Sequence, residues 1–148
     1  MKPLFQTKFG SEGNCLEACV ASLCEAAEVP DFRDDSGWWE DLVAYVRSKG
    51  LTAFYFPSDW PITPKGYHIM NGMGPRHRRH SVIGLDGKMV HDPHPEGGGI
   101  HRTDSYILLF REATCNECKA TIVVNPPIQS QCRMCGAVLL MVGCMFGG

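Results

Sequence analysis

Two pairs of cysteines near the C-terminus constrain the fold of this 148-residue chain more than any other feature. Cys115 and Cys118 form one Cys-x-x-Cys pair, Cys132 and Cys135 form the other, and thirteen residues separate the pairs. Zinc prefers four thiolates in a tetrahedron, and each pair supplies two of them from a tight turn. We therefore expect residues 113–148 to form a zinc ribbon. Its zinc would be structural, because four protein ligands leave no open position for water.

These four cysteines are otherwise read as buried or disulfide-bonded, and the cellular compartment decides between the readings. The chain holds eight cysteines, which in a reducing compartment indicates metal binding or catalysis. The first residues lack the apolar core of a signal peptide, and no stretch is long and apolar enough to span a bilayer. We therefore expect a cytoplasmic protein without a membrane partner.

The overall charge balance gives no sign of a nucleic-acid partner, because the formal net charge is −2. The run Arg76-His77-Arg78-Arg79 is a local exception. It is either a solvated loop or a binding patch, and the sequence leaves both open.

Residues 1–112 are expected to form a separate domain that begins with helices. A first helix is predicted over residues 15–27, with Asn14 as its N-cap. Apolar residues recur there at steps of three and four, which places them on one face of the helix. They are Leu16, Cys19, Val20, Leu23 and Ala27.

A second helix is predicted over residues 37–49, with Ser36 as its cap and Gly50 at its end. Strands are predicted over residues 51–56, 66–71, 80–85, 88–91 and 106–110. Asp86-Gly87 is a hairpin signal between two of them. Because the helices precede the strands, the expected class is α+β with an antiparallel sheet.

Cys15 stands where a glycine-rich loop enters the first predicted helix. A thiolate at that point faces unpaired N–H groups and the positive end of the helix, which favours its charged form. Cys19 and Cys24 lie deeper in the same helix and are expected to be buried small hydrophobes. A buried or capping role is the alternative for Cys15, so its assignment as a nucleophile depends on partners elsewhere.

A nucleophilic cysteine needs a base within hydrogen-bond reach, and the base needs a carboxylate or an amide to fix its tautomer. His80 opens a predicted strand, and Asp92 follows it by twelve residues. With a two-residue Asp-Gly turn, Asp92 would lie on the face opposite His80. The pairing therefore requires a bulged turn, or an Asp92 beyond the end of its strand. Gln6, upstream of Cys15, is a candidate amide donor to an oxyanion.

The order Gln6, Cys15, His80 and then Asp92-Pro93 resembles that of papain-like cysteine peptidases. Within them, it is most similar to the compact bacterial double-glycine peptidases that trim peptide leaders. The order Cys, His, Asp-Pro is also similar to the transglutaminase core, which is a related fold. The resemblance covers about residues 4–110, and the whole chain is similar to small proteins encoded by phages and their hosts.

Two short stretches carry the resemblance. Residues 14–19, Asn-Cys-Leu-Glu-Ala-Cys, are similar to the family's Asp-Cys-Gly-x-Ala-Cys, and His80-Ser81-Val82 is similar to its His-x-Val. Leu16 stands where the family has glycine. Gln6 lies nine residues before Cys15, a longer spacing than in the family.

The resemblance implies a papain-like fold in which the helix carrying Cys15 packs on the antiparallel sheet. It further implies a peptidase or amidase that acts on a peptide or protein through an acyl-enzyme. Cys15 would be the nucleophile, His80 the base and Asp92 its orienting carboxylate. Gln6 and the backbone N–H of Cys15 would stabilise the oxyanion.

Three alternatives remain open at this point. The same constellation serves acyl transfer to an amine, as in transglutaminases. Two His-x-x-His pairs, His77 with His80 and His91 with His94, have spacing suited to zinc or iron. The third alternative is a non-catalytic adaptor that keeps a degenerate papain-like fold and binds a partner through its ribbon.

Overall fold

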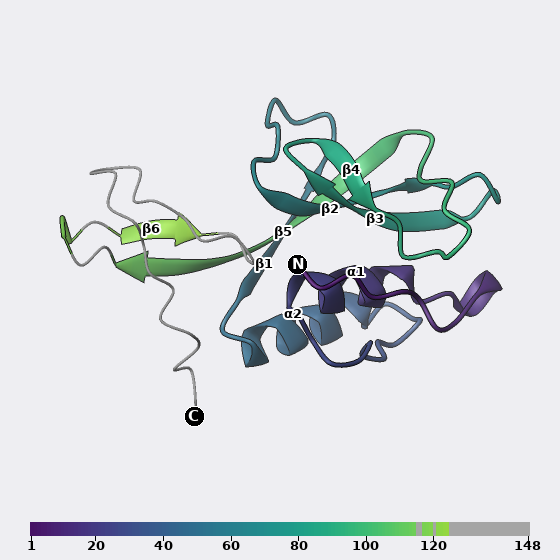
Figure 1. The fold of residues 1–148 in the computed structure, drawn as a ribbon, viewed down its shortest axis with the longest axis horizontal. Helices are drawn as coiled ribbons and strands as arrows, with labels where there is room; N and C mark the ends of the chain where they lie inside the picture. Colours follow the sequence, from purple (N-terminus) through teal and green to yellow (C-terminus); the bar gives the residue numbers. More distant parts are fainter. Residues whose placement is uncertain (115–116, 120, 125–148) are drawn as a thin grey trace.

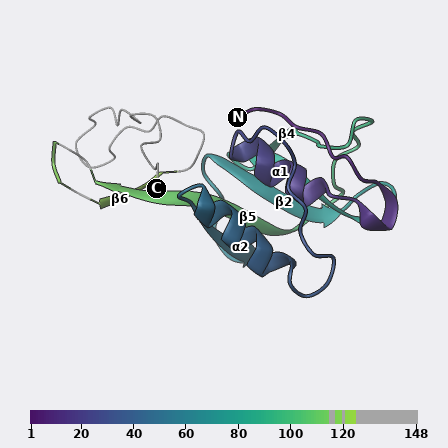
Figure 2. The same cartoon turned by 90° about the horizontal axis from the view of Figure 1, so that it is seen from below.

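The computed structural model describes residues 1–114, 117–119 and 121–124. Helices α1 (Cys15–Leu23) and α2 (Trp38–Ser48) come first in the chain, and the strands follow. Both helices lie on one face of an antiparallel sheet (Figures 1 and 2). The α+β class expected from the order of the elements is confirmed.

The sheet is formed by strands whose order in space differs from their order in the chain. They are β1 (Thr52–Pro57), β2 (Tyr67–Met73), β3 (Arg79–Leu85), β4 (Lys88–His91), β5 (Thr103–Thr114) and β6 (Thr121–Val124). The spatial order is β1-β5-β2-β3-β4, and β6 pairs with β5 off this path. The long strand β5 therefore lies between β1 and β2, and β3 and β4 form a hairpin at the other edge.

The main core lies between the helices and the sheet. Ile69 on β2 pairs with Ile83 on β3 and with Ile107 on β5, so three isoleucines form a row across the sheet. All three are fully buried in one cluster with the apolar face of α1. Each such side chain contributes roughly 1.5–3 kcal/mol of hydrophobic stabilisation. The packing of this row against α1 holds that helix, and with it Cys15, against the sheet.

The ends of both helices differ in part from the expectations. α1 ends at Leu23 and not near Ala27, because Glu25 takes a left-handed φ of 52°. Its N–H and that of Ala26 bond back to the carbonyls of Ser22 and Ala21, which is a Schellman motif. A non-glycine residue supplies this turn, so the sequence carried no glycine signal for it.

The expected cap of α2 is wrong at one end and right at the other. Gly37, not Ser36, is the N-cap residue, and its N–H donates to Oδ1 of Asp35 at 2.7 Å. Gly50 follows the helix with φ 75°, as expected of a terminating glycine.

Strand β5 crosses the expected boundary between the two domains at residues 112 and 113. It continues to Thr114 and pairs there with β6, so that Thr114 faces Thr121 across the hairpin. Cys118 lies exposed in the connection between the two strands. Cys115, Cys132 and Cys135 lie outside the described residues, and the zinc ribbon and the boundary at 113 stay predictions.

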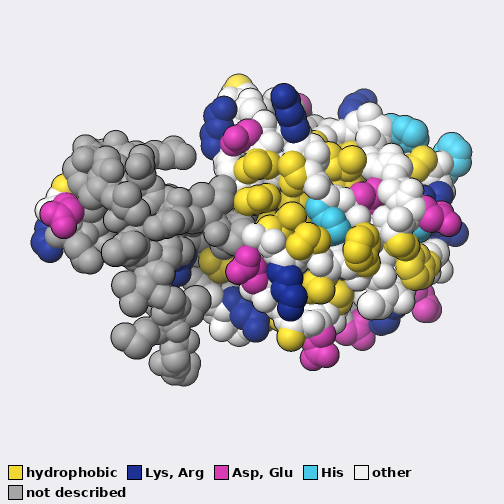
Figure 3. Space-filling model, viewed as in Figure 1, with side chains coloured by type: hydrophobic (Ala, Val, Ile, Leu, Met, Phe, Trp, Pro, Cys, Tyr) yellow, Lys and Arg dark blue, Asp and Glu magenta, His cyan; other side chains and the backbone are white. Residues whose placement is uncertain are grey.

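The surface of the described part is mixed in character. On the face seen in Figure 3, hydrophobic side chains gather over the sheet, and acidic and basic side chains are interspersed around them. None of the helices in the described ranges combines the length and apolar character that crossing a bilayer requires.

Candidate active site

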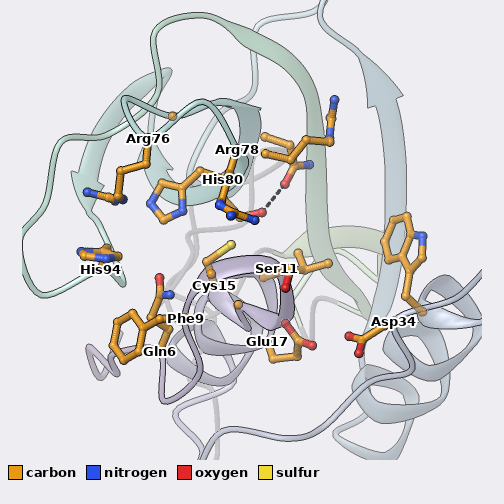
Figure 4. A pocket seen from close by; sticks show the side chains of 18 of the residues that line it. Gln6, Phe9, Ser11, Cys15, Glu17, Asp34, Arg76, Arg78, His80 and His94 are labelled. Carbon is orange, nitrogen blue, oxygen red and sulfur yellow. Dashed lines mark hydrogen bonds between the residues drawn. The ribbon is translucent and has the colours of Figure 1, made fainter.

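Cys15 is the first residue of α1 and follows the short turn η1 (Gly10–Glu12). Its side chain is partly exposed and lines a cavity of about 780 Å³. The sulfur points into this cavity, toward the side occupied by His80 (Figure 4). Because Cys15 precedes the first intrahelical hydrogen bond, its backbone N–H is also unpaired within the helix.

Asn14 occupies the N-cap position that was expected, but its side chain does not cap the helix. Its Oδ1 instead accepts the backbone N–H groups of Thr7 and Lys8, both at 2.9 Å, and its Nδ2 donates to Oγ1 of Thr7 at 2.9 Å. Asn14 is buried. Asn14 therefore holds residues 6–8, which we call the lead-in segment, next to the start of α1.

Gln6 lines the same cavity as Cys15 and is 7% exposed. Its backbone N–H donates to the carbonyl of Pro93 at 3.0 Å, which fixes the lead-in segment beside the Asp-Pro pair. The side-chain Nε2 donates to the carbonyl of Lys8 at 2.8 Å, which leaves one of its two N–H bonds for another acceptor. Its Oε1 is buried and has no hydrogen-bond partner among the described residues.

The β3–β4 hairpin turns at Asp86 and Gly87, as expected. Leu85 pairs with Lys88, so the turn has two residues. Both take positive φ, 52° for Asp86 and 84° for Gly87, as a type I′ turn requires. With this turn alone, Asp92 would lie on the face opposite His80.

A β-bulge in β4 removes this conflict. After the turn the register shifts by one residue, so that Ile83 pairs with His91 and Val90 is the inserted residue. The shift turns Asp92, one residue past the end of β4, toward His80. Nε2 of His80 lies 2.7 Å from Oδ1 of Asp92. The hairpin thus uses the simple turn and still brings the two side chains together.

Asp92 is held by donors from three directions. Besides His80, the backbone N–H of His94 donates to its Oδ1 at 2.8 Å and that of Gly99 to its Oδ2 at 2.7 Å. Burial acts to raise the pKa of Asp92, but these hydrogen bonds more than offset it, and the pKa lies below its usual range. Asp92 is therefore an ionised hydrogen-bond acceptor for His80 at neutral pH.

His80 is 8% exposed and lies between Asp92 and Cys15. Burial on its own lowers the pKa of this imidazole. Interactions with Cys15 and with Asp92 act in the opposite direction, and the net pKa is raised above its ordinary value. Because Nε2 is bound to Asp92, the nitrogen available to Cys15 is Nδ1.

The two His-x-x-His pairs do not converge on a metal site. Nε2 of His91 bonds to the carbonyl of Leu4 at 2.9 Å, and His80 is bound to Asp92. His77 is exposed in the turn between β2 and β3. No group of three His, Cys, Asp or Glu side chains in the described part of the chain is arranged to hold a metal ion.

His94 is a cavity residue that the sequence reasoning considered only as a metal ligand. Its ring lies edge-on to those of Phe9 and His80, at centroid distances of 5.3 and 6.4 Å. Nδ1 accepts the backbone N–H of Glu96 at 3.2 Å, so the proton of the neutral ring lies on Nε2. The sequence shows that His94 follows Asp92 by two residues, but it does not show on which side of the sheet His94 lies.

His68 is fully buried on β2 and provides a test through the pH dependence of stability. Nδ1–H donates to the carbonyl of Gly66 at 2.9 Å, while Nε2 has no hydrogen-bond partner among the described residues. Burial lowers the pKa of His68 below 6.5. The unfolded chain therefore binds the proton first on acidification, and folding is destabilised as the pH falls below about 6.5.

We expect the free energy of unfolding to decrease between pH 7 and pH 5 by at most about 1.4 kcal/mol per pH unit from this residue. Urea unfolding curves at several pH values measure it. In His68→Gln the slope should become shallower, whereas the exposed His77→Gln should leave it unchanged. An unchanged slope in His68→Gln would contradict the assignment.

Comparison with known proteins identifies no relative of this chain. The chain matches no protein-family model, no curated protein and no solved structure at a significant level. The function is therefore inferred from the residues of this chain alone.

Proposed function

We propose that this chain is a cysteine hydrolase of papain-like type that cleaves an amide, peptide or isopeptide bond through an acyl-enzyme on Cys15. One observation carries the proposal. Cys15 and His80 meet in a single cavity, and the second ring nitrogen of His80 is bound to a buried carboxylate, Asp92. A nucleophile, a base and an orienting group thereby lie next to one another in this order.

In the proposed reaction, His80 takes the thiol proton and the sulfur of Cys15 attacks the carbonyl carbon. As the C–N bond breaks, His80 gives this proton to the leaving nitrogen, and a thioester remains on Cys15. Water then attacks the thioester while His80 accepts its proton, and the proton returns to Cys15 as the acid leaves. Asp92 stabilises the imidazolium in both steps.

The oxyanion of the proposed tetrahedral intermediate would lie near the start of α1. The unpaired backbone N–H of Cys15 and the remaining N–H of Gln6 Nε2 are its donors. The positive end of the helix acts in the same direction. This use of Gln6 is supported by its burial beside Cys15.

A second part of the proposal is a structural zinc held by Cys115, Cys118, Cys132 and Cys135. The spacing of the pairs supports it, as does the exposed position of Cys118 between two paired strands. A hairpin of this kind presents a Cys-x-x-Cys pair at its tip. The zinc takes no part in the proposed chemistry.

The proposal predicts an acyl adduct on one cysteine. We expect that a pool of activated acyl-peptide esters, quenched in acid, adds the mass of one acyl group to Cys15, as read by intact-protein and peptide mass spectrometry. The adduct should be absent from Cys15→Ala and retained in Cys24→Ala, the matched control from the end of the same helix.

Two further outcomes have defined meanings. Transfer of the acyl group to an added amine in preference to water would assign acyl transfer in place of hydrolysis. The absence of any adduct on Cys15 would contradict the proposal and favour a binding protein.

A further inference from the structure

The turn between β2 and β3 carries a concentration of positive charge directly before His80. We call residues 74–79 the arginine turn, because it contains Arg76, Arg78 and Arg79. The N–H of Gly74 donates to the carbonyl of Arg78 at 2.8 Å, and that of His77 to the carbonyl of Gly74 at 3.1 Å. These bonds hold the turn in one shape, including a left-handed φ of 53° at His77.

The arginine charges are largely unneutralised. Arg79 lies 3.6 Å from Asp104 in a pair whose side chains are 67% and 33% exposed, which contributes little. Among the described residues, the guanidinium of Arg76 hydrogen-bonds only a neutral group, the carbonyl of Gly97 at 3.3 Å. The guanidinium of Arg78 has no ion-pair or hydrogen-bond partner within the described ranges.

All three arginines line the cavity that contains Cys15. In Figure 4, Arg76 and Arg78 lie on the His80 side of the cavity, and Glu17 and Asp34 lie on the opposite side. A further lining arginine, Arg33, is paired with Asp41 at 2.9 Å. The cavity is therefore electrically polarised, although the whole chain has a net charge of −2. Elsewhere on the visible surface the two signs are interspersed (Figure 3).

We propose that Arg76 and Arg78 form an anion subsite that selects acidic peptides, binding a carboxylate side chain close to the scissile bond. This inference rests on the proposed function and names its substrate class. A guanidinium presents a planar fork that binds a carboxylate through two hydrogen bonds, so arginines in a cleft that pair with none of the described carboxylates favour this ligand.

A peptide fits this cavity better than a nucleic acid. Nucleic acids carry a phosphate charge at every nucleotide, and binding them requires an extended basic surface. Here three of the four arginines that line the cavity lie in one short turn, and the fourth, Arg33, is paired with Asp41. Glu17 and Asp34 on the opposite wall repel a polyanion. A peptide can place one carboxylate at the arginine turn and neutral or basic groups near the acidic wall.

The subsite can be tested without any hydrolysis. Iodoacetate and iodoacetamide share the same reacting carbon, but only iodoacetate is anionic, so their rate ratio at Cys15 reports the local potential. We expect this ratio to fall roughly threefold for each arginine charge removed, in Arg78→Ala and in the Arg76→Ala/Arg78→Ala double variant. The matched control is Arg47→Ala, an exposed arginine on α2 that does not line the cavity.

Added salt should reduce the ratio in the wild type and affect the double variant less. A ratio that is equal in all four proteins would overturn the anion subsite. Because alkylation needs no substrate, this result stands whether or not the protein hydrolyses peptides.

A second experiment measures the hydrolysis of fluorogenic peptides with Asp, Asn or Lys next to the scissile bond. We expect kcat/KM to favour Asp over Asn by about tenfold, and Arg78→Ala to abolish that preference. Cleavage without an acidic preference would overturn the subsite while leaving the hydrolase intact. Protection of Cys15 by a single-stranded oligonucleotide and not by an acidic peptide would overturn the choice of ligand.

Discussion

Alanine in place of His80 is expected to slow turnover of an amide substrate by about a thousandfold, which is the usual scale of a lost general acid–base. Alkylation of Cys15 by iodoacetamide near neutral pH should slow by at least about tenfold. Both effects have one cause. His80 is the base beside Cys15 in the cavity, and it takes the thiol proton in turnover and in alkylation alike.

Cys19 within α1 and Cys24 directly after it serve as internal references for the reactivity of Cys15. Burial raises the pKa of Cys19 well above its ordinary value and that of Cys24 to about 11, so both should react far more slowly than Cys15 in the wild type. Peptide mass spectrometry after timed quenching gives all three rates in one sample. His77→Ala removes an exposed histidine and should leave the rates unchanged.

Asp92→Asn provides a graded comparison. The NH2 group of asparagine would face the backbone N–H of either His94 or Gly99, which places two donors opposite each other. The substitution therefore disturbs this loop as well as His80. Turnover should decrease strongly, while alkylation should decrease less than in His80→Ala. If Cys15 reacts no faster than Cys24 in the wild type, the proposed nucleophile is wrong.

The class and the order of elements could be predicted because they depend on local patterns. Apolar residues at steps of three and four predicted the first helix, a cap and a terminating glycine predicted the second, and the Asp86-Gly87 pair predicted the hairpin but not the length of its turn. The C-terminal end of α1 could not be predicted equally well. Glu25 in a left-handed conformation ends the helix, and a glutamate gives no signal for such a turn.

The candidate site depended on a feature that the sequence does not reveal. Asp92 reaches His80 only because Val90 is an extra residue in β4, and Val90 itself is an ordinary β-branched residue. The position of a bulge depends on the pairing of the whole hairpin, so parity arguments from the sequence had to leave it open.

Positioning residues were also missed for physical reasons. Asn14 was expected to cap the helix, which is its usual role, but tertiary contacts direct its side chain to Thr7 and Lys8. Arg78 belongs to a charge run that is more typical of a solvated loop than of a binding patch. Only the arrangement in space shows that this run lines the cavity of Cys15.

A glycine beside the candidate site is expected to be among the least replaceable residues of the chain. Gly72 pairs with His80 across β2 and β3, and the register between β2 and β5 shifts at the same point. A Cβ atom on Gly72 would overlap the backbone carbonyl of Arg102, which cannot rotate away as a side chain could. The close approach of β5 to β2 at this bulge therefore requires glycine.

We expect Gly72→Ala to lower the free energy of unfolding by about 3 kcal/mol, the upper end of the usual cost of overpacking. Chemical denaturation measures this, with Gly97→Ala as the control. Gly97 has φ 66° and nothing within 4 Å of an added Cβ, so its replacement should cost only about 1 kcal/mol of left-handed strain. Since relief of the overlap must move β5 or the strand pair that carries His80, Gly72→Ala should also slow alkylation of Cys15 in protein that is still folded. A variant as stable and as reactive as the wild type would show that the register at Gly72 does not position His80.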